Sequence, residues 1–326
     1  MKRLDHYWYS QNPVAWLLWP LSLIYRLLAG LRRNLYRRGV LSVYRAPKPV
    51  IVVGNISVGG TGKTPLIIHL CQWLARQGLR AGVISRGYGG NAAAYPMAVN
   101  AKSDPFEAGD EPVLIAMRTD SPVVVGPRRD QDVDMLLHEQ DVDLILADDG
   151  MQHYRLGRDA ELAVIDGRRG FGNGFCLPAG PLREPVSRLE TVDLQLVNGG
   201  DMQTSSFTMH AQQLVPMFGD GCACAVQDLT GQRVHAVAGI GHPQRFFDML
   251  REQGIDCIEH TFSDHHRFHR DELLYDDELP VLMTEKDAVK CSGFNLPRHY
   301  YVPIDIELSA SAQQAIEAII KRVCNG

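Results

Sequence analysis

The chain has 326 residues, 45% of them apolar and 22% charged, which is typical of a globular protein and excludes extensive disorder. This length accommodates two modest domains, or one large α/β domain with an addition. The net charge of −5 hides an asymmetry: residues 1–103 hold 14 Lys and Arg against one acid, and residues 104–326 hold 19 against 37. A basic first part predicts an anionic partner, either nucleic acid or an anionic lipid surface.

The N-terminal segment is first apolar and then basic. Its apolar run, Val14–Tyr25, has only 12 residues and contains Pro20, whereas a membrane span needs about 20. No small-residue cleavage site follows, which argues against a signal peptide. Beyond the run, arginines are interleaved with apolar residues (Arg26, Leu27, Leu28, Leu31, Arg32, Arg33, Leu35, Arg37 and Arg38).

This pattern predicts an amphipathic helix that lies in an anionic membrane surface. Trp8, Trp16 and Trp19 add the aromatic anchors that suit a lipid headgroup layer. A helix packed on its own domain is the alternative. Contacts to nucleic acid phosphates would not require so many apolar partners, so lipid is favoured.

From residue 50 onward, short apolar runs alternate with helical patterns. The runs predicted as strands are 50–53, 81–84, 122–125, 142–147, 161–165 and 192–197, and helical patterns cover Leu66–Leu74 and Asp132–His138. Such alternation predicts a mostly parallel sheet covered on both faces, within residues 1–200. The polar residues 201–216 predict an extended connector. A second strand–turn–helix pattern predicts a smaller α/β domain at 217–326.

The stretch GNISVGGTGKTP, residues 54–65, joins a predicted strand to a predicted helix. Strand, glycine-rich turn and Lys-Thr at a helix start form the P-loop arrangement that holds nucleotide phosphates. Ser57 stands where the usual pattern has glycine, but the later glycines still allow close backbone approach. We predict that Lys63 neutralises phosphate charge and that Thr64 ligates Mg²⁺. The predicted ATP-binding residues are Ser57, Val58, Gly59, Gly60, Thr61, Gly62, Lys63 and Thr64.

Acidic and histidine residues supply the remaining candidates. The predicted strand in VDLILADDGMQH ends in Asp148 and Asp149, at the sheet edge where ligands bind, and one of them would hold Mg²⁺. A simple turn is the alternative. Phosphoryl transfer to an alcohol also needs a base, and the candidates are Asp110 in AGDEP and the cluster FSDHHRFH at 262–269. A carboxylate paired with imidazole makes the better base, although such histidines can also be merely solvated.

Taken together, these stretches resemble tetraacyldisaccharide 4′-kinase, the lipid A 4′-kinase family of Gram-negative bacteria. The resemblance also includes SRGYGG at 85–90, FGNGFCLPAGPLREP at 171–185 and MTEKDAVK at 283–290, in this order. It implies a P-loop NTPase-like α/β domain with a second, smaller α/β domain and a membrane-associated N-terminal helix. The implied activity is transfer of the ATP γ-phosphate to the 4′-hydroxyl of a tetraacylated glucosamine disaccharide 1-phosphate, which forms lipid IVA in lipopolysaccharide biosynthesis.

The implied location is the cytoplasmic face of the inner membrane, as a peripheral or monotopic protein. The implied partners are ATP, Mg²⁺, the acylated disaccharide and the anionic membrane surface, without nucleic acid or an obligate protein partner. The seven cysteines lack metal-ligand spacing and are expected to be reduced packing residues, which is consistent with the cytosol.

The resemblance also implies roles for single residues, through the motifs that this chain shares with the family. The resemblance implies that Asp110 is the catalytic base and Glu111 a neighbouring acid on the metal side. His265 follows Asp264 and is implied as the partner of the base, with His266 left open. Other implied site residues are Lys63, Thr64, Asp148 and Asp149. Arg129 in GPRRD matches a family arginine near phosphate, with the neighbouring Arg128 left open. Gln152, Arg183 and Glu184 fall in matching motifs. The two domains are expected to close over the substrates so that base and histidine meet.

The strongest rival is a membrane-recruited regulatory ATPase of the partition or site-selection type. That class shares a glycine-rich GKT loop and an amphipathic helix, but it carries a lysine just before the paired glycines, where this chain has Val58. A scaffold that only binds nucleotide is disfavoured by the acids and histidines expected around the loop.

Overall fold

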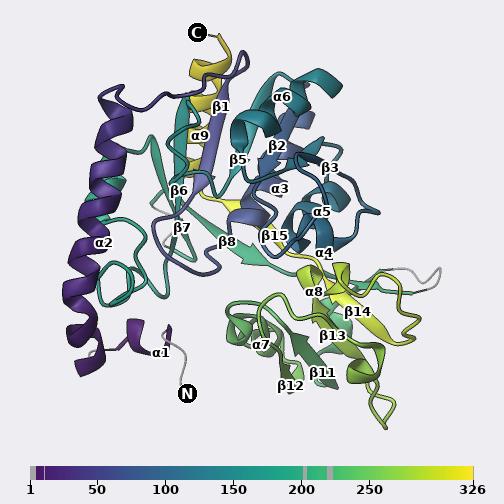
Figure 1. Ribbon diagram of the computed structural model, residues 1–326. Coiled ribbons are helices and arrows are strands. Elements are labelled where there is room, and N and C mark those ends of the chain that lie inside the picture. The colour runs from purple at the N-terminus through teal and green to yellow at the C-terminus, as the bar shows by residue number, and fades with distance from the viewer. Residues whose placement is uncertain (1–4, 11, 201–203, 219–222, 326) are drawn as a thin grey trace.

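The computed structural model describes residues 5–10, 12–200, 204–218 and 223–325. In this part of the chain, two sheets build two domains (Figure 1). The first has the order β15-β8-β7-β6-β1-β5-β2-β4-β3, and all its pairs are parallel except β3–β4 and β15–β8. Its strands are β1 (Val50–Gly54), β2 (Ala81–Ser85), β3 (Met97–Val99), β4 (Val123–Val125), β5 (Leu144–Asp148), β6 (Ala160–Asp166), β7 (Leu194–Asn198), β8 (Ser206–His210) and β15 (Asp305–Leu308).

Helices cover both faces of this sheet. Ile51 and Val53 of β1 pack into a core with α3, α5 and α9, while Val50 and Val52 pack into a second core with α6. Burial on both faces explains why the strands read as continuous apolar runs. The helical elements of this domain are α3 (Lys63–Arg76), α4 (Pro105–Ala108), α5 (Asp110–Arg118), α6 (Arg129–Glu139), η1 (Val186–Thr191) and α9 (Ala310–Asn325).

The second domain is built on the sheet β10-β9-β14-β13-β11-β12, in which β11–β14 form the parallel part. Its strands are β9 (Gln213–Pro216), β10 (Cys224–Ala225), β11 (Arg233–Ala238), β12 (Asp256–Thr261), β13 (Val281–Thr284) and β14 (His299–Val302). Its helical elements are η2 (Val226–Leu229), α7 (Pro243–Glu252), η3 (Arg270–Leu273) and α8 (Glu285–Val289). The predicted fold class, a mostly parallel α/β domain with a smaller α/β domain, is confirmed.

The domain boundaries differ from those predicted. Strand β8 pairs with β7, so part of the expected 201–216 connector belongs to the first sheet. Strand β15 pairs with β8, and Ile316 and Ile320 of α9 join the first core, so the chain end does not belong to the second domain. The apolar face of α9 covers β7, β8 and β15 in the core that α3 and α5 also line. The domains are joined by two short crossings, 211–212 and 303–304.

The N-terminus forms α1 (Asp5–Trp8) and α2 (Pro13–Arg37), which runs along one side of the first domain (Figure 1). Helix α2 has 25 residues and continues through Pro20, so it is far longer than the 12-residue apolar run and is long and apolar enough to cross a membrane by length and composition alone. One face packs on the domain: the Ser22 hydroxyl donates to the Cys176 carbonyl at 2.7 Å, and Trp16 meets Phe175 edge-on.

The other face of α2 presents an apolar stripe to solvent. Leu17 is 79% exposed, and the stripe continues at i+4 and i+3 spacings through Leu21, Ile24, Leu28 and Leu31. A stripe this long is not the surface of an ordinary soluble helix.

Among the described cysteines, Cys71, Cys176 and Cys291 are buried and Cys224, Cys257 and Cys324 are half-buried, all as free thiols, while Cys222 lies outside the described residues.

Candidate active site

The glycine-rich loop connects the end of β1 to the start of α3. Gly59 and Gly62 have φ values of 115° and 97°, a region that favours glycine, and Gly62 is the residue just before α3. A Cβ atom at Gly60 would meet nothing within 4 Å. The Val58 N–H donates to the Pro181 carbonyl at 2.8 Å, and Ser57 bridges to Leu182. The first half of the loop is therefore held by the protein itself, which leaves residues 59–62 and the α3 N-terminus as the candidate phosphate cradle.

Lys63 lies next to the acidic pair. Its Nζ atom is 3.5 Å from Oδ1 of Asp149, whose Oδ2 accepts a hydrogen bond from Arg183 at 2.8 Å. Burial acts to raise the pKa of Asp149, but Lys63 and Arg183 together lower it to about 2. Asp149 also has a positive φ of 48°, which turns its side chain from the strand end toward the loop.

Asp148 ends β5 beside Asp149. Its Oδ2 accepts a hydrogen bond from the Ser85 hydroxyl at 2.9 Å. Burial, together with the charges of Glu111 and Asp149, raises its pKa to about 7. Among the described residues, Oδ1 of Asp148 is buried without a hydrogen-bond partner, while Oδ1 of Asp149 is buried with the Lys63 ammonium 3.5 Å away. A buried carboxylate oxygen without a donor fits a hard divalent cation such as Mg²⁺.

Asp110 and His265 come from different domains and meet in the structure. Asp110 is the first residue of α5 and only 3% exposed, and its Oδ2 is 2.9 Å from Nδ1 of His265. The hydrogen bond to Asp110 raises the pKa of His265. Burial acts to raise the pKa of Asp110, but His265 and Lys286 lower it overall. His266 instead pairs with Glu272 at 3.0 Å.

The second domain also covers the loop. Gly241 follows β11, and a Cβ atom there would lie 3.3 Å from Oδ2 of Asp264 and 4.0 Å from the Gly60 nitrogen. The segment that carries His265 and the phosphate cradle therefore lie side by side. Asp110 and His265 are therefore in contact across the boundary between the two domains.

Two basic residues at the site were not identified from the sequence. Lys286 of α8 places Nζ 3.0 Å from Oε1 of Glu111, which was predicted on the metal side. Arg169 follows β6 and stacks on the Tyr9 ring at 3.8 Å, and its NH1 would lie 3.3 Å from a Cβ at Gly59. Lys286 lies in the motif MTEKDAVK, but only its contacts in the structure indicate a role for it. Arg169 lies in none of the motifs identified in the sequence.

Arg129 does not reach the loop through any contact in the described structure. It is 3% exposed, donates to the carbonyls of Gly126 at 2.9 Å and Asp148 at 3.2 Å, and pairs with Asp132 at 3.3 Å. Its partners make it a support for the end of β5, and the predicted position beside a phosphate has no contact in its favour. Arg128 is exposed and pairs with Asp130 at 2.8 Å.

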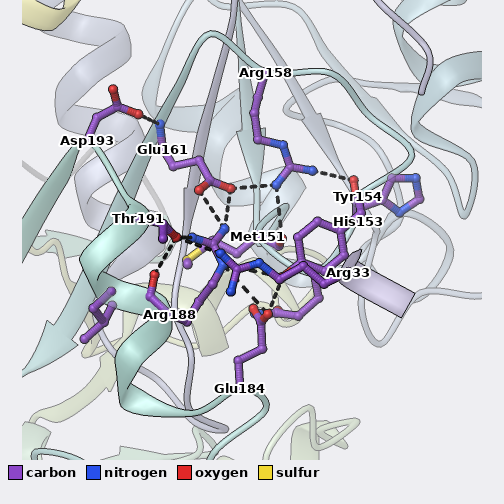
Figure 2. Close-up of polar contacts among 12 residues, drawn as sticks. Arg33, Met151, His153, Tyr154, Arg158, Glu161, Glu184, Arg188, Thr191 and Asp193 are labelled. Carbon is purple, nitrogen blue, oxygen red and sulfur yellow. Dashed lines mark hydrogen bonds and ion pairs between the residues drawn. The ribbon is translucent and has the colours of Figure 1, made fainter. Parts of the chain in front are cut away.

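A buried ion network supports the site from behind. Figure 2 shows Arg188 between Glu161 and Glu184, with two contacts of 2.6 Å to Glu161. Glu184 accepts hydrogen bonds from Tyr154 and, at 3.0 Å, from Gln152. The Oε1 atom of Gln152 in turn accepts from Arg183, the partner of Asp149. Three residues in matching motifs, Gln152, Arg183 and Glu184, thus form a continuous path to the acidic pair.

Comparisons with known proteins identify the family of this chain. The family model of LpxK, tetraacyldisaccharide-1-P 4′-kinase, matches residues 14–324. Tetraacyldisaccharide 4′-kinases of Nitrosococcus oceani and Haemophilus influenzae are each 48% identical, over 97% and 94% of this chain and 94% and 93% of theirs. A crystal structure of LpxK from Aquifex aeolicus, in complex with ATP, superimposes with a TM-score of 0.79 at 27% identity, covering 95% of this chain and 99% of that one. The chain belongs to the tetraacyldisaccharide-1-P 4′-kinase family.

Proposed function

We propose that this kinase transfers the γ-phosphate of ATP to the 4′-hydroxyl of a tetraacylated glucosamine disaccharide 1-phosphate, which yields lipid IVA. The observation that carries the proposal is the Asp110–His265 pair beside the phosphate cradle. A phosphate-binding loop alone would serve many nucleotide-dependent proteins. A buried carboxylate, hydrogen-bonded to an imidazole from the opposite domain, is the arrangement needed to take a proton from an alcohol.

The loop residues have distinct roles in this proposal. The backbone N–H groups of residues 59–62 would hold the phosphates, and Lys63 would neutralise charge on the β- and γ-phosphates. Support for ATP comes from the structural likeness to the ATP-bound LpxK of Aquifex aeolicus. Asp148, Asp149 and the Thr64 hydroxyl would hold Mg²⁺, with Glu111 nearby. When bound, the ion would neutralise charge that develops on the phosphates.

Asp110 acts as the base. As the 4′-oxygen forms its bond to the γ-phosphorus, the bond from phosphorus to the leaving ADP oxygen breaks, and Asp110 takes the hydroxyl proton. His265 holds the Asp110 carboxylate in place and supports its charge through Nδ1. Because His265 belongs to the second domain, the base is complete only when the domains are closed, which limits transfer to water.

Helix α2 would bring the site to its lipid substrate. Its apolar stripe faces away from the domain, while Ser22, Trp16 and Arg33 contact the domain on the other side. A helix held along the domain in this way can lie in a membrane surface without leaving its contacts, whereas a crossing would break them. The arginines in its second half suit an anionic leaflet. Because ATP is cytosolic, we place the protein at the cytoplasmic face of the inner membrane.

The test is a transfer assay. Purified protein in detergent receives Mg²⁺, γ-labelled ATP and tetraacyldisaccharide 1-phosphate, and label is followed into lipid on thin-layer plates. Wild type, Lys63→Ala and Asp110→Asn are run side by side, with a no-lipid control for free phosphate. We expect labelled lipid from wild type and at least a hundredfold less, about 10² or more, from either variant.

Lipid-independent phosphate release without labelled lipid would contradict the proposal and favour a regulatory ATPase. Labelled lipid that persists in Lys63→Ala would show that the loop is not the phosphate donor site.

A further inference from the structure

The Lys286 ammonium lies among three carboxylates at the domain boundary. Its Nζ atom is 3.0 Å from Oε1 of Glu111, 3.5 Å from Oδ1 of Asp264 and 3.8 Å from Oδ1 of Asp110. Glu111 and Asp110 belong to α5 of the first domain, and Asp264 belongs to the second. The Lys286 side chain is only 18% exposed, so water screens these contacts weakly.

The backbone that carries Lys286 is firmly held. Asp287, the next residue, is fully buried and accepts hydrogen bonds from the Thr284 hydroxyl at 2.6 Å and the Gly239 N–H at 2.8 Å. Lys290 pairs with its other oxygen at 2.6 Å. Gly239 begins the segment that leads to Gly241 above the phosphate cradle. One buried carboxylate therefore links the position of Lys286 to that of the segment covering the loop.

Lys286 and His265 contact the same catalytic carboxylate from the second domain. His265 contacts Oδ2 of Asp110, and Lys286 lies on the Oδ1 side. If Lys286 were removed, Asp264 would face Asp110 and Glu111 across the boundary with the His265 ring, 3.7 Å from its Oδ2 atom, as the remaining partner. Like charges at such distances repel and would oppose the approach of His265.

We propose that Lys286 is a positioning residue that bridges Asp264 to Asp110 and Glu111 and thereby holds the domains closed with His265 against the base. This inference rests on the proposed role of Asp110. Lys286 acts on the closed state and does not itself take the proton. Its loss should therefore reduce turnover more than the binding of ATP, which the first domain carries out.

The experiment compares full-length wild type, Lys286→Met and Lys286→Arg in the transfer assay. Lys102→Met, at an exposed lysine of the first domain, is the matched control. In the same proteins, fluorescence energy transfer is measured between labels on non-natural amino acids at exposed Gln77 and Glu278, one in each domain, with ATP and lipid present. Fluorescent ATP analogue binding to each variant verifies that the P-loop domain is folded.

We expect kcat of Lys286→Met to fall about 10- to 100-fold, because small misplacements of catalytic groups cost this much. The KM for ATP of Lys286→Met should change by less than roughly threefold, as it should in the Lys102→Met control. Fluorescence energy transfer should report a larger fraction of open molecules than in wild type. Lys286→Arg keeps the charge and should recover most of the turnover and of the closed fraction.

Unchanged kcat in Lys286→Met would overturn the proposal, as would reduced kcat with an unchanged closed fraction. If Lys286→Met does not bind the ATP analogue, Lys286→Arg decides alone: its kcat and its closed fraction should both stay near the wild-type values, and a loss of kcat without opening overturns the proposal. If wild type transfers no phosphate, the proposed function itself is contradicted. If wild type is active and Asp110→Asn is not, the proposed function holds, and the Lys286 variants then test the positioning role alone.

Discussion

The Nδ1 atom of His265 lies 2.9 Å from the Oδ2 atom of Asp110, although the two residues are 155 positions apart and belong to different domains. Tyr88 packs edge-on against the imidazole, and a Cβ at Gly89 would come within 2.9 Å of it. The segment SRGYGG therefore shapes the space in which the histidine sits. The pair forms across the boundary between the two domains.

Replacing either member of this pair should reduce transfer strongly. We expect Asp110→Asn and His265→Ala each to lower kcat by about 10²- to 10⁴-fold, because both remove the same base. The double variant should be little worse than the more damaged single variant, since the residues act as a unit. Steady-state kinetics measure this. Near-normal turnover in both single variants would disprove the pairing.

The Asp110–His265 pair should also make stability depend on pH. The raised pKa of His265 means that its contribution is fully present below about 6.5 and is lost as pH rises through the folded value. The lowered pKa of Asp110 adds stability above about 3.9 that is lost at lower pH. The difference in Tm between wild type and Asp110→Asn should therefore be largest between these values and shrink toward pH 9. A difference that grows above pH 7 would contradict this assignment.

The acidic pair should make transfer dependent on a divalent cation. Removing Mg²⁺ with EDTA should abolish labelling of the lipid, and added Mg²⁺ should restore it. Asp148→Asn, Asp149→Asn and Thr64→Val should each require more Mg²⁺ for half-maximal activity. Asp134→Asn, which changes an aspartate away from the loop, is the control. Full activity of all three variants at wild-type Mg²⁺ concentrations would exclude these residues as ligands.

The exposed stripe of α2 should determine membrane binding. Leu21→Glu or Leu28→Glu should lower the affinity for anionic vesicles at least about tenfold, because burial of a leucine contributes roughly 1.5–3 kcal/mol and a buried charge adds a cost. Asn34→Glu adds the same charge at an exposed polar position of the helix and should have a smaller effect. Flotation with vesicles measures the bound fraction. Equal flotation of all variants would rule out the stripe as the membrane contact.

The ion network in Figure 2 should contribute to stability. Arg188 is 2% exposed, and Glu161, which it contacts, also pairs with Arg158 at 2.7 Å. Arg188→Met should lower the free energy of unfolding by about 3 kcal/mol, because Glu161 stays buried with one cation fewer. Urea denaturation measures this. The variant Arg188→Met/Glu161→Gln should lose less than the single variant, and a larger loss would show that packing, not charge, dominates there.

Much of the first domain was predictable from local patterns. The strands at 50–53 and 142–147 were identified because a strand buried on both faces needs an uninterrupted apolar run. The helix start at Lys63 was identified because a glycine-rich turn followed by Lys-Thr is the pattern of a phosphate loop, and Gly62 has a positive φ just before the helix in the structure. Asp148 and Asp149 were placed near the loop because β1 and β5 are parallel and their carboxyl ends share one edge.

The errors concern the positions of segments relative to one another. Helix α9 was assigned to the wrong domain because an amphipathic helix specifies an apolar face but not which sheet will cover it. The position of Arg129 near phosphate stays a prediction, and its motif did not reveal that Asp132 and two carbonyls surround it. The 12-residue apolar run understated the length of α2, which continues through Pro20 to Arg37.

The sequence by itself determined the nucleotide loop, the acidic strand end, the α/β class and the basic, apolar character of the N-terminus, because turn chemistry and hydrophobic periodicity are local properties. Only the tertiary structure decided that His265, not His266, meets Asp110, that Lys286 lies among three carboxylates, and that α9 returns to the first domain. Those relationships depend on how distant segments of the chain pack and how the two domains meet. The two partners of each contact lie far apart in the sequence, so no local stretch contains both of them.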